Sequence, residues 1–363
     1  MFSKSELQLL ALLKFGLWGQ KDDEDLDFHS VDWAEIIKMA QKQTTIGILY
    51  DGITLLNQTL RPDKLTLIEL FGKTVQIEKT NKKLNERLVE VVCKYRAAGL
   101  CPVLLKGQGI GQYYPNPLHR QPGDIDLFFF KDFNKANSVA ASWKGVHFEP
   151  KTTYHQGLLY KDTEIENHLV YVDFYSKKNK RAWHKIQEII PLVDKEKFIL
   201  EDFQVDVPSS QMNVIYIFLH LMHHFLQVGV GLRQVCDWIC LLNVKHDQID
   251  KDLFLKCVDE LHLRRSMTAL TYVVTHYLGL PVNYIPLDAS TKQAQRDGEF
   301  MLRDILDMGN FGFDQNIFEG FERNKHLKNY RTYYKFLIRY IKLYRFYPSE
   351  VRAYPWVWLK SKF

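Results

Sequence analysis

The stretch RQPGDIDLFFF at residues 120–130 decides how the centre of this chain folds. Its apolar second half predicts a β-strand. Strand side chains alternate between two faces, so Asp124 and Asp126 share one face while Ile125 and Leu127 share the other. Two neighbouring carboxylates repel each other and are costly to bury without a partner. The pattern therefore predicts a cation, and Mg²⁺ is the natural candidate because it prefers oxygen ligands and often accompanies phosphate. A plain turn or a solvated strand face is the simpler interpretation.

A glycine turn precedes this strand. Residues 102–105 (PVLL) are apolar and indicate another short strand, which Lys106 and Gly107 follow directly. Glycine lets a backbone N–H approach a phosphate closely, and a helix after the turn would offer the positive end of its dipole to the same anion. A turn, a helix and a strand with two aspartates form a layout suited to a phosphate and a metal ion.

The segment LKGQGIGQYYPNPLHRQPGDIDL at residues 105–127 resembles the nucleotidyltransferase superfamily with the polymerase-β-like fold. It is most similar to a branch of uncharacterised bacterial nucleotidyltransferase-like proteins, which carry Leu-Lys-Gly, then Arg, then Gly-Asp-Ile-Asp-Leu at about this spacing. The superfamily pattern is a Gly-Gly or Gly-Ser turn, Asp-x-Asp, and a third carboxylate on a later strand. This chain departs from it with Lys106-Gly107-Gln108 at the turn. Residues 231–238 (GLRQVCDW) are similar to the downstream helical segment of the branch.

The resemblance implies a nucleotidyltransferase that uses a nucleoside triphosphate and two Mg²⁺ ions, held by Asp124, Asp126 and a third carboxylate. The reaction would transfer a nucleoside monophosphate to a hydroxyl group of a small molecule, a sugar or a protein. A further set of residues would contact the nucleotide: Lys106, Gly107, Gln108, Arg120 and Arg233.

Simpler interpretations of the basic residues exist. Lys106 would be a solvated strand end, and Arg120 would lie in a surface loop. Arg233 would form an ion pair with Asp237, which follows four residues later on the same helical face.

The third carboxylate is expected on a β-hairpin at residues 154–174. Glu166 and His168 share a strand face by alternation and resemble the carboxylate-x-His unit of the branch. Glu166 is therefore the first candidate, and Asp173 is the second because its position places it on the opposite face unless a bulge intervenes. An exposed strand charge is the simpler interpretation of either carboxylate, and an ordinary hydrogen-bonded side chain is the simpler one for His168.

Periodicity divides the chain into three parts. Residues 1–99 and 208–363 carry helical patterns, while residues 100–207 alternate strands and helices. We therefore expect an α+β fold, with a small mixed β-sheet forming the nucleotidyltransferase core between N-terminal and C-terminal helical regions. The 363 residues suffice for two or three domains.

Composition indicates a cytoplasmic globular protein. Apolar residues make up 46% and charged residues 25% of the chain, which are ordinary values. No apolar run approaches a membrane span, and the first residues show no apolar signal core. The five cysteines are odd in number and lack Cys-x-x-Cys spacing, so we expect reduced thiols rather than disulfides.

Two further patterns are open to more than one interpretation. His220 and His224 would share a helix face, but the segment lacks the glutamate of a His-Glu-x-x-His zinc motif, so packing or groove-lining histidines are expected. The chain is rich in Lys and Arg from Arg323 onward. Arg339 and Lys342 fall on a basic stripe of a predicted helix there, which a nucleic acid or a solvated surface would explain.

Two functions from different classes follow. The first is a Mg²⁺-dependent nucleotidyltransferase, with an RNA-binding form as a variant. The second is a non-catalytic nucleotide-binding or regulatory module with the same fold, which the unusual turn at Lys106 and Gly107 makes plausible. In the second case Gln108 or Tyr113 could fill the phosphate pocket.

Overall fold

Helices make up the N-terminal part of the chain in the computed structural model, which describes residues 2–19, 27–150, 152, 154–312 and 325–362. The bounds are α1 Lys4–Trp18, α2 Trp33–Lys42, α3 Ile46–Leu55 and α4 Lys64–Ala97. The side chains of Ser3, Asp32 and Asp63 accept hydrogen bonds from backbone N–H groups at the starts of α1, α2 and α4, as N-cap residues do. The helical pattern expected for residues 1–99 is thus present, with α4 as the longest of these helices.

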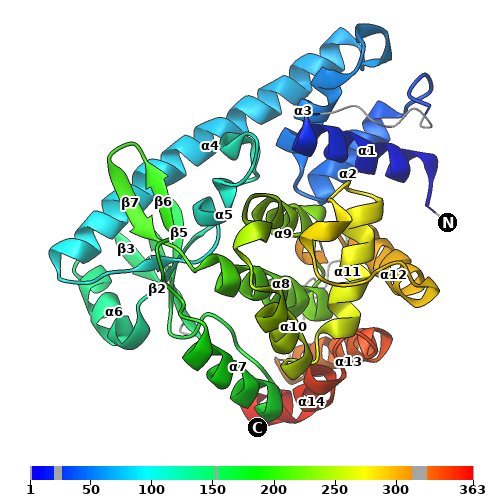
Figure 1. Ribbon diagram of the computed structural model, residues 1–363. Coiled ribbons are helices and arrows are strands. Elements are labelled where there is room, and N and C mark those ends of the chain that lie inside the picture. The colour runs from blue at the N-terminus through cyan, green and yellow to red at the C-terminus, as the bar shows by residue number, and fades with distance from the viewer. Residues whose placement is uncertain (1, 20–26, 151, 153, 313–324, 363) are drawn as a thin grey trace.

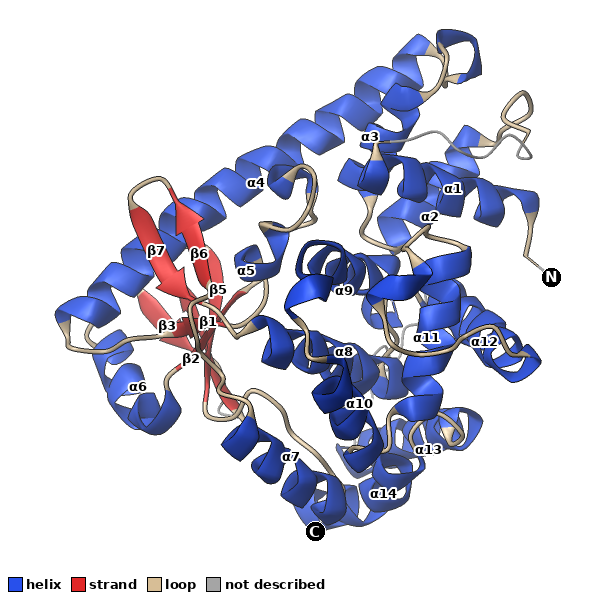
Figure 2. Ribbon diagram, in the orientation of Figure 1, coloured by secondary structure: helices blue, strands red, loops and turns tan. Residues whose placement is uncertain are grey.

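The strands of the described chain all lie between Val103 and Asp206 and form one seven-stranded sheet of order β3-β4-β5-β2-β1-β7-β6. Their bounds are β1 Val103–Leu104, β2 Ile125–Phe128, β3 Val146–Phe148, β4 His155–Tyr160, β5 Thr163–His168, β6 Lys197–Leu200 and β7 Phe203–Asp206. β2 pairs parallel with β5, and β1 pairs parallel with β7, while the other neighbours are antiparallel. The sheet is mixed and flanked by helices (Figure 2), which confirms the expected α+β class.

Strand pairing sets the positions of the polar residues. In the parallel pair of β2 and β5, Asp126 lies opposite Glu166. In the antiparallel hairpin of β4 and β5, His155 lies opposite His168. The expected hairpin is therefore present, but β5 ends at His168. Asp173 lies beyond the strand, so strand alternation does not determine the direction of its side chain.

The other face of the sheet carries an apolar layer. Ile125 and Leu127 of β2 are buried in one cluster with Val91 and Tyr95 of α4 and Ala136 of α6 (Phe133–Ala141). Figure 1 shows α4 running along the sheet, with α6 at the far end. Because the apolar positions of β2 face these helices, alternation turns its aspartates toward the opposite side.

Helices cover that opposite side. They are α7 Lys177–Ile189, α8 Ser210–Gln227, α9 Leu232–Lys245, α10 Lys251–Glu260, α11 Arg264–His276, α12 Lys292–Met308, α13 Lys325–Leu343 and α14 Pro348–Lys362. Their apolar side chains belong to one large buried cluster that also includes α1 and α3. Gln43 donates to the carbonyls of Ile305 and Leu306, so the N-terminal helices pack against the C-terminal ones.

The C-terminal basic stripe differs from expectation. Arg339 is buried, and its guanidinium lies 2.8 Å from one carboxylate oxygen of Asp304. The other oxygen of Asp304 lies 2.8 Å from Lys342 Nζ. Ile338 and Ile341 of the same helix are exposed. The helix turns one of its arginines inward because Asp304 offers it a buried partner, so Arg339 is not part of a free basic face.

Glu350 connects the last helix, α14, to the segment between β5 and α7. Its buried carboxylate accepts hydrogen bonds from the N–H groups of Tyr175 and Ser176 and from the Asn179 side chain, at the start of α7. Burial raises the pKa of Glu350 from 4.5 to about 7, although these donors oppose the rise. The carboxyl thus caps α7 from a distant part of the chain.

This pKa gives a testable pH dependence. Between about pH 4.5 and 7 the folded protein retains a proton on Glu350 that the unfolded chain has lost, so the free energy of unfolding should fall as pH rises through this window. A Glu350→Gln variant stays neutral throughout, so its stability relative to wild type should rise from pH 4.5 to 7 and then level off. Urea unfolding at several pH values measures the difference, and a difference independent of pH would contradict the assignment.

Candidate active site

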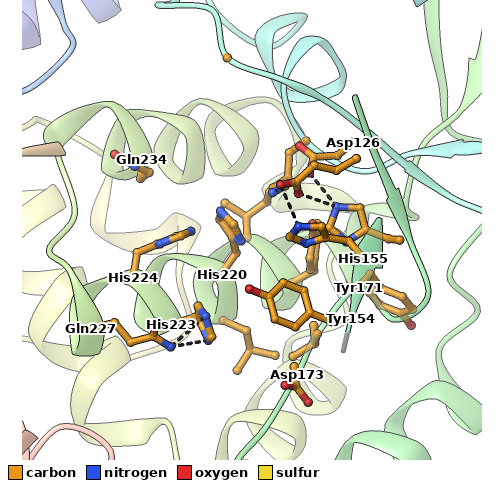
Figure 3. A pocket seen from close by; sticks show the side chains of 18 of the residues that line it. Asp126, Tyr154, His155, Tyr171, Asp173, His220, His223, His224, Gln227 and Gln234 are labelled. Carbon is orange, nitrogen blue, oxygen red and sulfur yellow. Dashed lines mark hydrogen bonds and ion pairs between the residues drawn. The ribbon is translucent and has the colours of Figure 1, made fainter. Parts of the chain in front are cut away.

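A cavity of about 560 Å³ lies between the polar face of the sheet and helices α8 and α9. β2 and β5 contribute Asp126 and Glu166, while His220 of α8 and Arg233 of α9 lie on the helical wall. Figure 3 shows Asp126 and His155 close together, with the histidines of α8 across from them. The cavity is the place where the polar residues of the core meet.

Three carboxylates come together at the sheet side of this cavity. Oxygen atoms of Asp124, Asp126 and Glu166 all lie within 4.8 Å of one another. The charge of Asp126, followed by burial, raises the pKa of Asp124 to about 6, and nearby Lys106 opposes the rise. Such mutual repulsion is what a bound cation would relieve.

The two oxygens of Asp126 have different surroundings. Oδ1 lies 2.8 Å from Lys106 Nζ and 2.8 Å from His168 Nε2, whereas Oδ2 is buried without a hydrogen-bond partner. Burial alone would raise the pKa of Asp126, but Lys106 and His168 hold it well below its usual range. An ionised, buried and unpartnered oxygen beside two further carboxylates fits a hard divalent cation such as Mg²⁺.

The turn before α5 (Gln108–Gly111) differs from the expected phosphate cradle. Lys106 lines the cavity but is paired with Asp126, and this carboxylate holds the pKa of Lys106 above its usual value despite burial. Gly107 has φ +54°, and a Cβ there would lie 3.1 Å from the Asp124 carbonyl oxygen, so glycine suits the turn. The Gln108 side chain donates to Asn85 of α4 at 2.6 Å and is not among the residues that line the cavity.

Arg120 and Arg233 both line the cavity, with different partners from those expected. Arg120 is buried and forms a bidentate pair with Asp237, at 2.7 Å and 2.9 Å, rather than lying in a surface loop. Arg233 donates to the carbonyls of Gln121 and Pro122. The intrahelical ion pair considered for Arg233 and Asp237 is therefore not formed. Asp237 pairs with Arg120 instead, which joins α9 to the loop before β2.

The second candidate for the third carboxylate lies elsewhere. Asp173 lines the cavity, but it is not part of the carboxylate group, and Figure 3 shows it well away from Asp126. Burial raises its pKa. Glu166 is placed beside Asp126 by strand pairing, so the geometry favours Glu166 over Asp173 for this role.

The histidines of α8 that line the cavity have lowered pKa values. Burial lowers the pKa of His223 to about 4 and the pKa values of His220 and His224 well below the usual value, with Lys106 adding to the effect. Gln227 donates to His223. These histidines give the cavity an uncharged polar wall opposite the carboxylates.

His155 was not singled out from the sequence. It lines the cavity, lies opposite His168 in the hairpin, and places Nε2 at 3.4 Å from Glu166 Oε1. The register of the hairpin is the feature that could have identified His155. His155 lies opposite His168 only if the turn consists of residues 161 and 162. Alternation within a single strand does not reveal where the turn lies.

The site thus combines a mixed sheet, a carboxylate group suited to a metal ion and a cavity with basic residues, which are the features of a phosphoryl-transfer protein. Residues 29–279, more than half of the chain, match the model of a family described as uncharacterised nucleotidyltransferase. The chain belongs to this family, which confirms the resemblance to the nucleotidyltransferase superfamily. No curated protein and no solved structure matches the chain.

Family membership indicates the class of ligands. Nucleotidyltransferases generally use a nucleoside triphosphate and a divalent metal ion, and the group of Asp124, Asp126 and Glu166 could hold such an ion. Among the described helices, none has the length and apolar content needed to cross a membrane.

The buried pair of Arg120 and Asp237 can be tested against an exposed pair of the same geometry. Asp237→Asn leaves Arg120 without its charge partner in a buried site, so the variant should lose about 3 kcal/mol or more of unfolding free energy. Asp259→Asn breaks the bidentate pair with Arg264, whose side chains are 54% and 52% exposed, and should cost less than about 1 kcal/mol. Urea unfolding gives both values, and equal losses would show that burial of the Arg120 pair has no special weight.

Proposed function

We propose that this protein is a Mg²⁺-dependent nucleotidyltransferase that transfers a nucleoside monophosphate from a nucleoside triphosphate to a hydroxyl group of an acceptor. The observation that carries the proposal is the group of Asp124, Asp126 and Glu166 at the wall of a cavity, with Asp126 Oδ2 buried and unpartnered. These carboxylates would hold two Mg²⁺ ions, which neutralise charge on the transferring phosphoryl group.

The basic residues of the cavity have separate tasks. Lys106 neutralises Asp126 and presents an ammonium group at the same wall, where phosphate oxygens would lie. Arg233 holds the carbonyls of Gln121 and Pro122 and thereby positions the loop that leads into Asp124. Arg120 is occupied by Asp237, so its contribution is to fix the cavity wall and to add positive potential.

The acceptor would lie in the same cavity beside the nucleotide phosphates. The cavity is also lined by Tyr171, Tyr175 and His223, which suit an uncharged ring or a hydroxylated group. A volume of about 560 Å³ favours a small molecule or a sugar over a protein as the acceptor.

The non-catalytic alternative requires a blocked pocket, and two side chains were candidates to block it. Neither Gln108 nor Tyr113 lines the cavity. The unusual turn therefore leaves the space beside the carboxylates open, which supports the enzyme over the regulatory module.

Nucleotide titrations with carboxylate variants test the metal group. Asp124→Asn and Glu166→Gln should each abolish Mg²⁺-dependent binding of the preferred nucleotide among ATP, GTP, CTP and UTP, because the site loses a ligand charge. Asp173→Asn is the matched control, since Asp173 lines the same cavity outside the carboxylate group. Calorimetry on folded samples gives the affinities.

The results separate the two functions. Binding that depends on Asp124 and Glu166 but not on Asp173 supports the transferase. If a folded wild-type protein bound none of the four nucleotides in ample Mg²⁺, the non-catalytic module would be the better account, and loss of binding in Asp173→Asn alone would move the third ligand to Asp173.

A lysine variant tests the phosphate contact. Lys106→Ala should weaken nucleotide binding by about tenfold or more, because a charge-assisted contact to phosphate is lost. Lys161→Ala, at the exposed hairpin turn, removes a lysine that pairs with Glu90 and should leave the affinity unchanged. Equal affinities in the two variants would show that Lys106 serves only to neutralise Asp126.

A further inference from the structure

A second group of possible metal ligands lies beside the carboxylate group. One nitrogen each of His155 and His168 and one carboxylate oxygen of Glu166 all lie within 4.8 Å of one another. The three residues line the same cavity. Nucleotidyl transfer as proposed above uses Glu166 as a metal ligand and His168 as a partner of Asp126, so it leaves His155 without a role.

Strand pairing brings these residues together. His155 of β4 lies directly opposite His168 of β5, and Glu166 precedes His168 by two residues on the same strand face. The two imidazole rings have centroids 5.5 Å apart. The group is built on paired strands rather than on a loop, so its geometry is held by the hydrogen bonds of the sheet.

The polar atoms converge on Glu166. Its Oε1 lies 3.4 Å from His155 Nε2, and its Oε2 lies 3.2 Å from His168 Nε2. The other ring nitrogen, His155 Nδ1, is buried and has no hydrogen-bond partner, so hydrogen bonds do not occupy both nitrogens of this ring. His168 Nε2 also lies 2.8 Å from Asp126 Oδ1, so a cation bound to this nitrogen would take the place of the proton that the two residues share.

The ligand types select the metal. Imidazole nitrogen suits Zn²⁺, Co²⁺ and Fe²⁺, whereas Mg²⁺ prefers oxygen ligands and retains several of its waters. Two histidines and one carboxylate also leave coordination positions open for water or a substrate oxygen.

We propose that His155, Glu166 and His168 form a site for a divalent transition-metal ion, adjacent to the all-carboxylate site and sharing Glu166 with it. The inference does not depend on nucleotidyl transfer. It assigns the cavity two neighbouring cation positions with different ligand chemistry, of which the imidazole-containing position is selective against Mg²⁺.

Co²⁺ alone is the probe for this site. The full chain is treated with a chelator, dialysed and titrated with Co²⁺ in the absence of nucleotide, with binding followed by calorimetry and by visible absorption, which reports the ligand field of the ion. Wild type should bind Co²⁺ in the presence of excess Mg²⁺. His155→Ala should weaken the affinity by at least about tenfold, the scale of a disturbed metal site.

Two control variants make the result specific. His223→Ala removes another histidine that lines the cavity but lies outside the group, and should leave Co²⁺ affinity unchanged. Asp124→Asn removes a ligand of the carboxylate group only, so it should retain Co²⁺ binding while losing Mg²⁺-dependent nucleotide binding. A His155→Gln variant replaces His155→Ala if the latter does not fold, and should show the same loss.

The outcomes separate this inference from the proposed transferase. Equal Co²⁺ affinity in His155→Ala and His223→Ala, or displacement of Co²⁺ by Mg²⁺ at similar concentration, would overturn the imidazole site even if nucleotides bind. Histidine-dependent Co²⁺ binding in a protein that binds no nucleotide would support the site and count against the transferase.

Discussion

The buried carboxylate of Asp126 is the constraint on which the site depends. It is almost fully removed from solvent, and its Oδ1 lies 2.8 Å from both Lys106 and His168. An ionised carboxylate without such partners would cost several kcal/mol, by the usual order of magnitude for buried charges. Lys106 and His168 keep Asp126 ionised, while its second oxygen is buried without a hydrogen-bond partner in a group of three carboxylates.

This arrangement requires a rigid support, which the opposite face of the sheet provides. Ile125 and Leu127 alternate with Asp126 along β2 and pack in the apolar cluster of α4 and α6. A slip of one residue in β2 would exchange the two sets and bury the aspartates among apolar side chains, so the register is strongly specified. The parallel pairing of β2 with β5 then places Glu166 beside Asp126.

The helical part of the protein completes the cavity through polar contacts. Arg120, in the loop before β2, pairs with Asp237 of α9, and Arg233 of the same helix holds the carbonyls of Gln121 and Pro122. The buried charges of Arg120 and Asp237 thus neutralise one another, and the loop leading to Asp124 is held at both its start and its middle. The neutral histidines of α8 form the facing wall.

The sequence by itself determined the α+β class, a hairpin within residues 154–174, the common face of Asp124 and Asp126, and the family, because alternation and a motif of short range are visible in a single strand. That the hairpin ends at His168 came from the structure. It did not determine which charges would pair. Lys106 contacts Asp126, Arg120 pairs with Asp237, and Arg339 turns inward to Asp304. His155 joined Glu166 and His168 only through hairpin register. These pairings join residues that are distant in sequence, or they depend on strand register. A buried charge pairs with the opposite charge that the packing places nearby. Only the tertiary structure therefore decided which residues pair.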